Sequence, residues 1–171
     1  KVESGNHFLQ SLNPALTINA IAAKASEDLL NTFLPAVDLV LDCTDNFATR
    51  QLVNQACFIH KIPLVSGSAL KFDGQLSVFD FRNQISPCYA CLFSPEEQFE
   101  EVSCASMGIF SPLVGIIGSM QAAQALQVLI GFGQPLVGRM LLWNAMNTQI
   151  DEIRVARNPA CKVCSSQHQK N

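Results

Sequence analysis

Two Cys-x-x-Cys pairs, Cys88/Cys91 and Cys161/Cys164, most strongly limit how this chain can fold. Each pair places two thiolates on one side of a tight turn, and four thiolates make the full coordination shell of a structural zinc ion. Because 69 residues (92–160) separate the pairs, a shared zinc requires the carboxyl-terminal tail to return beside the middle of the chain. The sequence therefore predicts a zinc clip that joins these two segments.

A redox function is the alternative for the same cysteines. A single Cys-x-x-Cys pair also occurs in proteins whose two thiols cycle to a disulfide. Two pairs, each close to a turn residue (Pro87 and Pro159), favour a metal over redox cycling. A four-cysteine shell leaves no open position on the ion, so we expect this zinc to stabilise the fold and not to catalyse.

The composition indicates one globular domain with an extensive buried surface. The chain has 171 residues, of which 49% are apolar and 15% charged, and its formal net charge is −3. That length is sufficient for one domain with a substantial core. The sequence has no basic stripe, which argues against nucleic-acid binding. An odd number of cysteines, seven, and the lack of a hydrophobic leader predict a cytoplasmic protein with metal-bound thiols.

An apolar run at residues 112–130 is nearly long enough to span a membrane. Gln121, Gln124 and Gln127 recur every three residues within it and would form a polar stripe on a helix, which favours burial in protein over a bilayer. Gly131 is a suitable residue to end the helix. We expect a helix that does not enter a membrane and that forms the subunit contact of a homodimer.

The rest of the pattern predicts an α/β fold. Short apolar runs at 37–43 and 63–68 are typical of buried parallel strands, and a helical segment at 46–60 separates them. This order implies a right-handed crossover between two parallel strands. Alternating or short periodic patterns predict further strands at 15–22, 74–81, 139–143 and 149–155, and short helices at 3–12 and 27–33. The last three predicted strands, at 74–81, 139–143 and 149–155, have an antiparallel pattern unlike that of the parallel pair, so the sheet should be mixed.

A polar sequence follows the first predicted parallel strand. Residues 43–50 read Cys-Thr-Asp-Asn-Phe-Ala-Thr-Arg, so Asp45 falls between the end of the strand and the start of the helix. Ligands bind at this edge of open α/β sheets, and an exposed carboxylate there can hold Mg²⁺ against phosphates. The alternative, and the commoner use of such residues, is that Asp45 or Asn46 only caps the helix. Arg50 could form a structural ion pair with Asp42 or Asp45, or face a phosphate.

Three cysteines lie outside the two pairs. Cys104 falls in a predicted loop, and a loop thiol can act as a nucleophile. No histidine lies near it in sequence, and Glu100 and Glu101 would disfavour its thiolate, so an ordinary loop thiol is an equal alternative. Cys43 and Cys57 fall in a predicted strand and a predicted helix, where we expect small core residues.

Together these motifs resemble the ubiquitin-activating-like adenylyltransferases, the HesA/MoeB/ThiF family. The resemblance rests on C-T-D-N-x-x-T-R at 43–50, P-L-V-S-G-S-A at 63–69, G-Q at 74–75, and the two cysteine pairs, in this order and spacing. Residues 1–4, 65–67 and 157–161 favour the molybdopterin-synthase type. A Rossmann-like mixed sheet with an antiparallel carboxyl-terminal portion and a four-cysteine zinc clip is the fold that this resemblance implies.

The resemblance also implies an activity and a set of site residues. The activity is ATP-dependent adenylation of the carboxyl-terminal glycine of a ubiquitin-like sulfur-carrier protein (MoaD or ThiS type) in molybdopterin or thiamin biosynthesis. Asp45 would be the magnesium-linked carboxylate, Asn46 part of the nucleotide site and Lys1 a phosphate contact. Cys104 would match a cysteine that accepts the carrier or sulfur covalently in some members. The face around residues 76–81 is where we expect the body of the carrier to dock.

The chain departs from the family in one respect. The family has a glycine-rich nucleotide loop upstream of the lysine that Lys1 matches, and no G-x-G-x-x-G motif occurs in the 171 residues. Residues 1–171 are therefore expected to form a single domain equivalent to the carboxyl-terminal two-thirds of an adenylyltransferase, inactive alone because the nucleotide half lies upstream. The alternative is a zinc-stabilised carrier-binding or dimerisation module without adenylation activity.

Overall fold

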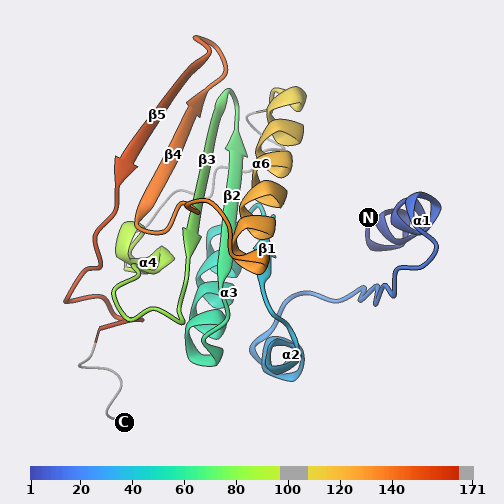
Figure 1. Cartoon of the computed structure of the whole chain (residues 1–171), viewed down its shortest axis with the longest axis horizontal. Helices are drawn as coiled ribbons and strands as arrows, with labels where there is room; N and C mark the ends of the chain where they lie inside the picture. The colour runs from blue at the N-terminus through green and yellow to red at the C-terminus, as the bar shows by residue number, and fades with distance from the viewer. Residues whose placement is uncertain (97–107, 166–171) are drawn as a thin grey trace.

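The computed structural model describes residues 1–96 and 108–165. Its centre is a five-stranded sheet in the order β1-β2-β3-β4-β5 (Figure 1). The strands are β1 (Val40–Asp42), β2 (Leu64–Leu70), β3 (Asp73–Phe79), β4 (Arg139–Asn144) and β5 (Gln149–Arg154). The helices are α1 (Val2–Leu12), α2 (Glu27–Phe33), α3 (Phe47–His60), α4 (Tyr89–Leu92) and α6 (Ser111–Ile130), with a 3-10 helix, η1 (Leu34–Ala36).

One parallel pair begins the sheet, and antiparallel strands complete it. β1 pairs with β2 in parallel, with Asp42 opposite Ser66, and α3 connects the two strands. β2 turns directly into β3, and β3, β4 and β5 follow as antiparallel neighbours. This arrangement confirms the predicted mixed sheet with an antiparallel carboxyl-terminal portion.

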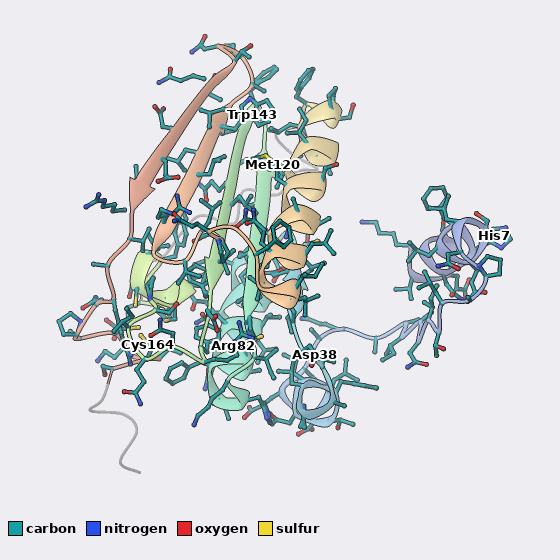
Figure 2. All side chains as sticks on the ribbon, in the orientation of Figure 1. His7, Asp38, Arg82, Met120, Trp143 and Cys164 are labelled. Carbon is teal, nitrogen blue, oxygen red and sulfur yellow. The ribbon has the colours of Figure 1, made fainter. Side chains whose placement is uncertain are left out.

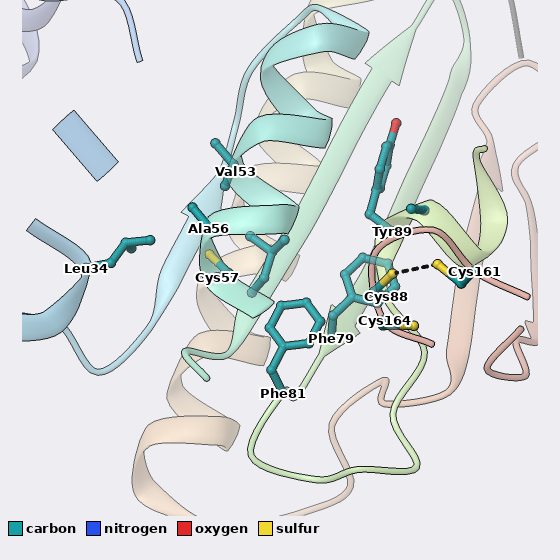
Figure 3. Close-up of a cluster of buried hydrophobic side chains, with 12 residues drawn as sticks. Leu34, Val53, Ala56, Cys57, Phe79, Phe81, Cys88, Tyr89, Cys161 and Cys164 are labelled. Carbon is teal, nitrogen blue, oxygen red and sulfur yellow. Dashed lines mark hydrogen bonds between the residues drawn. The ribbon is translucent and has the colours of Figure 1, made fainter. Parts of the chain in front are cut away.

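Helices cover both faces of the sheet at β2 and β3. Side chains alternate along a strand, so Leu64 and Phe79 lie on one face and Val65 and Val78 on the other. The first face packs in a buried cluster with residues of α3, and Phe81 completes this cluster (Figure 3). The second face packs against α6 through residues such as Ala125 and Val128. The two clusters hold α3 and α6 on opposite faces of the sheet.

Two expectations about the fold are wrong. Residues 15–22 form no strand, because an alternating pattern supplies two faces but not a neighbouring strand to pair with. The adjoining α1 has no buried residue and stands apart from the sheet (Figure 1). The face around residues 76–81 cannot dock a carrier, because Leu76, Val78 and Phe79 are at most 1% exposed in the middle of the sheet.

Candidate functional site

The loop of residues 43–46 joins β1 to α3 and is shaped by two local side chains. The buried Asp42 carboxylate accepts hydrogen bonds through Oδ1 from the Thr44 backbone nitrogen (2.9 Å) and the Thr44 hydroxyl (2.7 Å). Asn46 caps α3, because its Oδ1 accepts a hydrogen bond from the Thr49 backbone nitrogen at 2.9 Å. Asp45 lies between these two anchors and is exposed. The cap is therefore Asn46, and the Asp45 carboxylate is not the helix cap.

Arg50 holds the same loop from the α3 side of the sheet. Its guanidinium is buried, lies 3.6 Å from Asp42 Oδ2, and donates to the Ser66 hydroxyl (3.2 Å). It also donates to the carbonyl oxygens of Gly67 (2.9 Å) and Thr44. Of the roles considered from the sequence, the ion pair with Asp42 is the one formed. Arg50 thereby links both parallel strands to the loop.

Gln121 reaches the same strands from α6, on the other face. Its Nε2 donates to the carbonyl oxygens of Asp42 (2.9 Å) and Val65 (3.3 Å). Its Oε1 accepts a hydrogen bond from Cys43 Sγ at 3.5 Å. Sequence reasoning treated this residue only as part of a polar stripe and missed its contact with the loop. The available signal was an amide side chain at a position surrounded by apolar residues that face the sheet.

Cys43 is the second residue that the sequence misplaced. Cys43 lies in the loop after β1, is exposed and lines a cavity, so it is not a core residue. Partial burial, followed by the nearby charge of Asp42, raises the pKa of the Cys43 thiol. Cys57, in contrast, is a core residue as predicted, and burial raises its pKa to about 12.

A cavity of about 830 Å³ opens beside Asp45 at the carboxyl ends of the parallel strands. Its wall follows β2 from Gly67 to Leu70, continues to Lys71 in the turn after this strand, and includes Trp143 of β4. Figure 2 shows Trp143 at one end of the sheet and Cys164 at the other. A cavity at this edge, with a carboxylate at its margin, is the arrangement in which open α/β sheets bind ligands.

The structure does not bring all the predicted site residues together. Asp45 lines the cavity, whereas Asn46 is occupied as a helix cap and is not among the residues of the cavity wall. Lys1 is exposed at the start of α1, also outside that wall. Cys104 lies outside the described residues. The proposed roles of these four residues stay predictions.

The four paired cysteines converge as predicted. Their sulfur atoms all lie within 4.8 Å of one another. The Sγ–Sγ distances are 3.8 Å for Cys88–Cys91, 3.6 Å for Cys88–Cys161 and 3.4 Å for Cys91–Cys164. A tetrahedral zinc with Zn–S bonds of about 2.3 Å requires sulfur atoms about 3.8 Å apart, so the cluster fits this metal.

Local contacts orient the cluster and favour a cation in it. The backbone nitrogens of Cys88 and Asn158 each donate to Cys91 Sγ at 3.4 Å. Arg157 donates to the carbonyl oxygens of Gln84 and Cys164, so it fastens the tail to the loop before Cys88. Hydrogen bonds with Cys164 and Cys91, and then burial, raise the pKa of Cys88. Four thiolates this close therefore need a bound cation to be stable together.

A mixed sheet covered by helices, with a cavity at the ends of its parallel strands and a four-cysteine cluster, defines a Rossmann-like α/β protein with a candidate metal centre. Residues 1–163 match the ThiF family, and the chain belongs to that family.

Several curated adenylyltransferases are similar to this chain. It is 40% identical over 166 residues to the molybdopterin-synthase adenylyltransferase of Salmonella typhimurium, a match covering 96% of this chain and 65% of the relative. It is also 40% identical over 163 residues to the sulfur carrier protein adenylyltransferase of Thermus thermophilus, covering 93% and 60%. Adenylyltransferase and sulfurtransferase MOCS3 of Drosophila virilis is 41% identical, with 98% and 37% covered. The chain thus spans less than two thirds of each of these relatives.

Solved structures support the fold. A crystal structure of Escherichia coli MccB with MccA-N7isoASN superposes with a TM-score of 0.79 at 18% identity, covering 97% of this chain and 52% of MccB. At that identity the likeness concerns the fold alone. It confirms the Rossmann-like α/β class expected from the sequence.

Proposed function

We propose that this chain forms part of an adenylyltransferase that uses ATP to activate the carboxyl-terminal glycine of a ubiquitin-like sulfur carrier of the MoaD or ThiS type. The product would serve molybdopterin or thiamin biosynthesis. The observation that carries the proposal is the exposed Asp45 carboxylate at the edge of the cavity, in a chain whose relatives are named adenylyltransferases. Residues 1–171 would be a single domain equivalent to about two-thirds of the enzyme.

The chemistry explains why a carboxylate is needed at this position. A carrier carboxylate that attacks the α-phosphate of ATP approaches a group of like charge, so cations must offset that charge as the bond forms. Asp45 would hold Mg²⁺, which supplies this charge when bound. Lys1 would add a second cation and Asn46 a contact to the nucleotide. Cys104 would attack the acyl-adenylate and hold the carrier as a thioester, with AMP as the leaving group.

The cavity has the dimensions of an extended peptide tail. Its wall follows β2 over three residue steps, from Gly67 to Leu70. At about 3.3 Å per step this is about 10 Å, enough for about three extended residues. Gly67, Ala69 and Gly74 contribute little side-chain volume to the wall. These features support a carrier tail that lies along β2 with its terminal carboxylate near Asp45.

ATP–pyrophosphate exchange with the full-length protein and a purified sulfur carrier tests the proposal. We expect exchange that depends on both Mg²⁺ and the carrier's terminal glycine, and a carrier that lacks this glycine is the control. Carrier binding without exchange would instead support the module without adenylation activity. That alternative is motivated by the lack of a G-x-G-x-x-G motif in the 171 residues.

We also infer that the four-cysteine cluster binds a structural zinc. Its sulfur geometry supports this, and a closed thiolate shell would stabilise the tail without taking part in adenylation. We further propose a cytoplasmic location, because metal-bound thiols of this kind belong to a reducing compartment.

The outer face of α6 supports a homodimer. Among the described residues, α6 is the one helix whose length and composition would allow it to cross a membrane. Its inner face packs on β2 and β3, whereas Leu126, Leu129 and Ile130 are 52–68% exposed. Gly115 and Gly118 face open space and would let a second helix approach closely. Gln121 and Gln124 make their hydrogen bonds on the inner side of α6, so they leave the outer face apolar. We propose that a second copy of this chain covers that outer face.

Leu126→Glu should convert this dimer to a monomer. A carboxylate at the centre of an apolar contact would be buried without a partner, which costs several kcal/mol. Light scattering coupled to size-exclusion chromatography measures the mass. Met146→Glu places the same charge on an exposed apolar residue away from α6 and should leave the mass unchanged. An unchanged mass for both variants contradicts the α6 contact.

A further inference from the structure

We propose that Gln121 is a positioning residue that sets the place of Asp45 by fixing the loop of residues 43–46. For its catalytic consequence this inference rests on the adenylation proposed above. The structural part, that a side chain of α6 holds this loop, can be tested without any activity.

The first argument is where the Gln121 amide is used. Its Nε2 donates to the carbonyl oxygens of Asp42, the last residue of β1, and of Val65 on the neighbouring strand β2. Its Oε1 accepts from the thiol of Cys43, the first residue of the loop. The amide therefore joins β1, β2 and the loop at the point where the chain leaves the sheet.

The second argument is burial. Gln121 is only 4% exposed, on a helix without a charged residue. A buried amide is costly unless its donors and acceptor are satisfied, and here all three of its hydrogen bonds go to this one corner. An apolar side chain could fill the same space against the sheet. What only glutamine provides at this position is the set of directional bonds to β1, β2 and Cys43.

The third argument is the lack of space for a side chain at Gly67. A Cβ atom at this position would lie 2.3 Å from Cδ of Gln121 and 2.5 Å from its Oε1. Gly67 does not have a positive φ, so the backbone does not require glycine there. Glycine is needed because the Gln121 amide passes over it.

Side chains of α3 and α6 contact the loop of residues 43–46 from opposite faces of the sheet. Arg50 of α3 binds the Thr44 carbonyl from one face, and Gln121 of α6 binds Cys43 and Asp42 from the other. Asp45 follows directly and its carboxylate is exposed, so its position depends on the loop backbone. Groups that orient a metal-binding carboxylate typically change metal affinity by about 10–100-fold when removed.

Gln121→Leu tests the inference, with Gln124→Leu as the matched control. Gln124 lies on the same helix, and its hydrogen bonds go to Leu136 and Gln127 instead of the loop. Hydrogen–deuterium exchange, read by mass spectrometry on the peptide that contains residues 43–46, should be faster in Gln121→Leu than in the wild type. It should be unchanged in Gln124→Leu. Equal exchange of this peptide in both variants would overturn the inference.

Mg²⁺ dependence gives the catalytic readout on the full-length protein. In ATP–pyrophosphate exchange, Gln121→Leu should need about tenfold more Mg²⁺ for half-maximal rate, and excess Mg²⁺ should restore much of that rate. A purely structural loss would lower the melting temperature without changing the Mg²⁺ requirement, and that result also overturns the inference. Lack of exchange in the wild type would refute the proposed adenylation, while the deuterium comparison still decides the positioning role.

Gly67→Ala provides a second route if Gln121→Leu does not fold. The added methyl must displace the end of the Gln121 side chain, because the atoms that it meets belong to that flexible group. This variant keeps the glutamine but moves its amide, so it should reproduce the faster exchange of residues 43–46. Normal exchange in Gly67→Ala would contradict the role of Gln121.

Discussion

Replacing Asp45 with asparagine should lower the rate of carrier-dependent ATP–pyrophosphate exchange by about 10²–10³-fold in the full-length protein. The substitution keeps the shape of the side chain and removes only the charge that would hold Mg²⁺. The Asn46 cap and the Asp42–Thr44 hydrogen bonds do not involve the Asp45 side chain, so the fold should be retained. Carrier binding, measured by surface plasmon resonance, should be unchanged because the rest of the cavity wall is intact.

Asp38→Asn is the matched control for this prediction. Asp38 precedes β1 at its amino end and is exposed, whereas Asp45 follows the carboxyl end of the same strand (Figure 2 labels Asp38). The two variants change the net charge equally, but only one removes a carboxylate from the cavity. Exchange activity retained in Asp45→Asn, or lost equally in Asp38→Asn, would refute the role of Asp45.

Cys88→Ser should release the zinc and destabilise the protein by about 2–5 kcal/mol, comparable with the loss of a disulfide. Cys88 is fully buried between Cys91 and Cys161, and its sulfur is part of the core cluster that includes Phe79. Without the fourth thiolate the remaining ligands no longer close the shell, and the tail loses its attachment to the loop. Denaturant unfolding measures the stability, and elemental analysis measures zinc per chain.

Cys43→Ser is the control, because Cys43 lies outside the cluster and a serine hydroxyl can still donate to Gln121 Oε1. We expect one zinc per chain in the wild type and in this variant, and a stability within about 0.5 kcal/mol of the wild type. An unchanged unfolding midpoint for Cys88→Ser would exclude a structural metal. Recovery of the four cysteines as two disulfides under mild oxidation, without zinc, would support the redox alternative.

Most secondary structure was predictable because local patterns decide it. The run at 46–60 became α3 (Phe47–His60), with Asn46 as its cap, and the run at 112–130 became α6 (Ser111–Ile130). The apolar run at 63–68 became β2, and the alternating run at 74–81 became β3. Cap residues and hydrophobic period act within a few residues, so one sequence is enough to read them.

The candidate site was only partly predictable. Asp45 was found because its position follows from a strand end and a helix start. Gln121 was missed, because its partners Asp42 and Val65 are more than 50 residues away and nothing local signals them. Cys43 was misplaced for a similar reason, since burial depends on where a strand ends and what covers it. The strand expected at 15–22 did not form, because pairing needs a neighbour that an alternating pattern cannot supply.

The amino-acid sequence alone was sufficient to establish the α/β class, the family resemblance, the position of Asp45 and the four-cysteine set. Each of these follows from residue types at short or repeated spacings. Tertiary packing decided the rest: the cysteine pairs meet within 4.8 Å, and Gln121 and Arg50 hold one loop from opposite faces. Such contacts join residues far apart in the chain, so their geometry exists only once the sheet and its two covering helices are assembled.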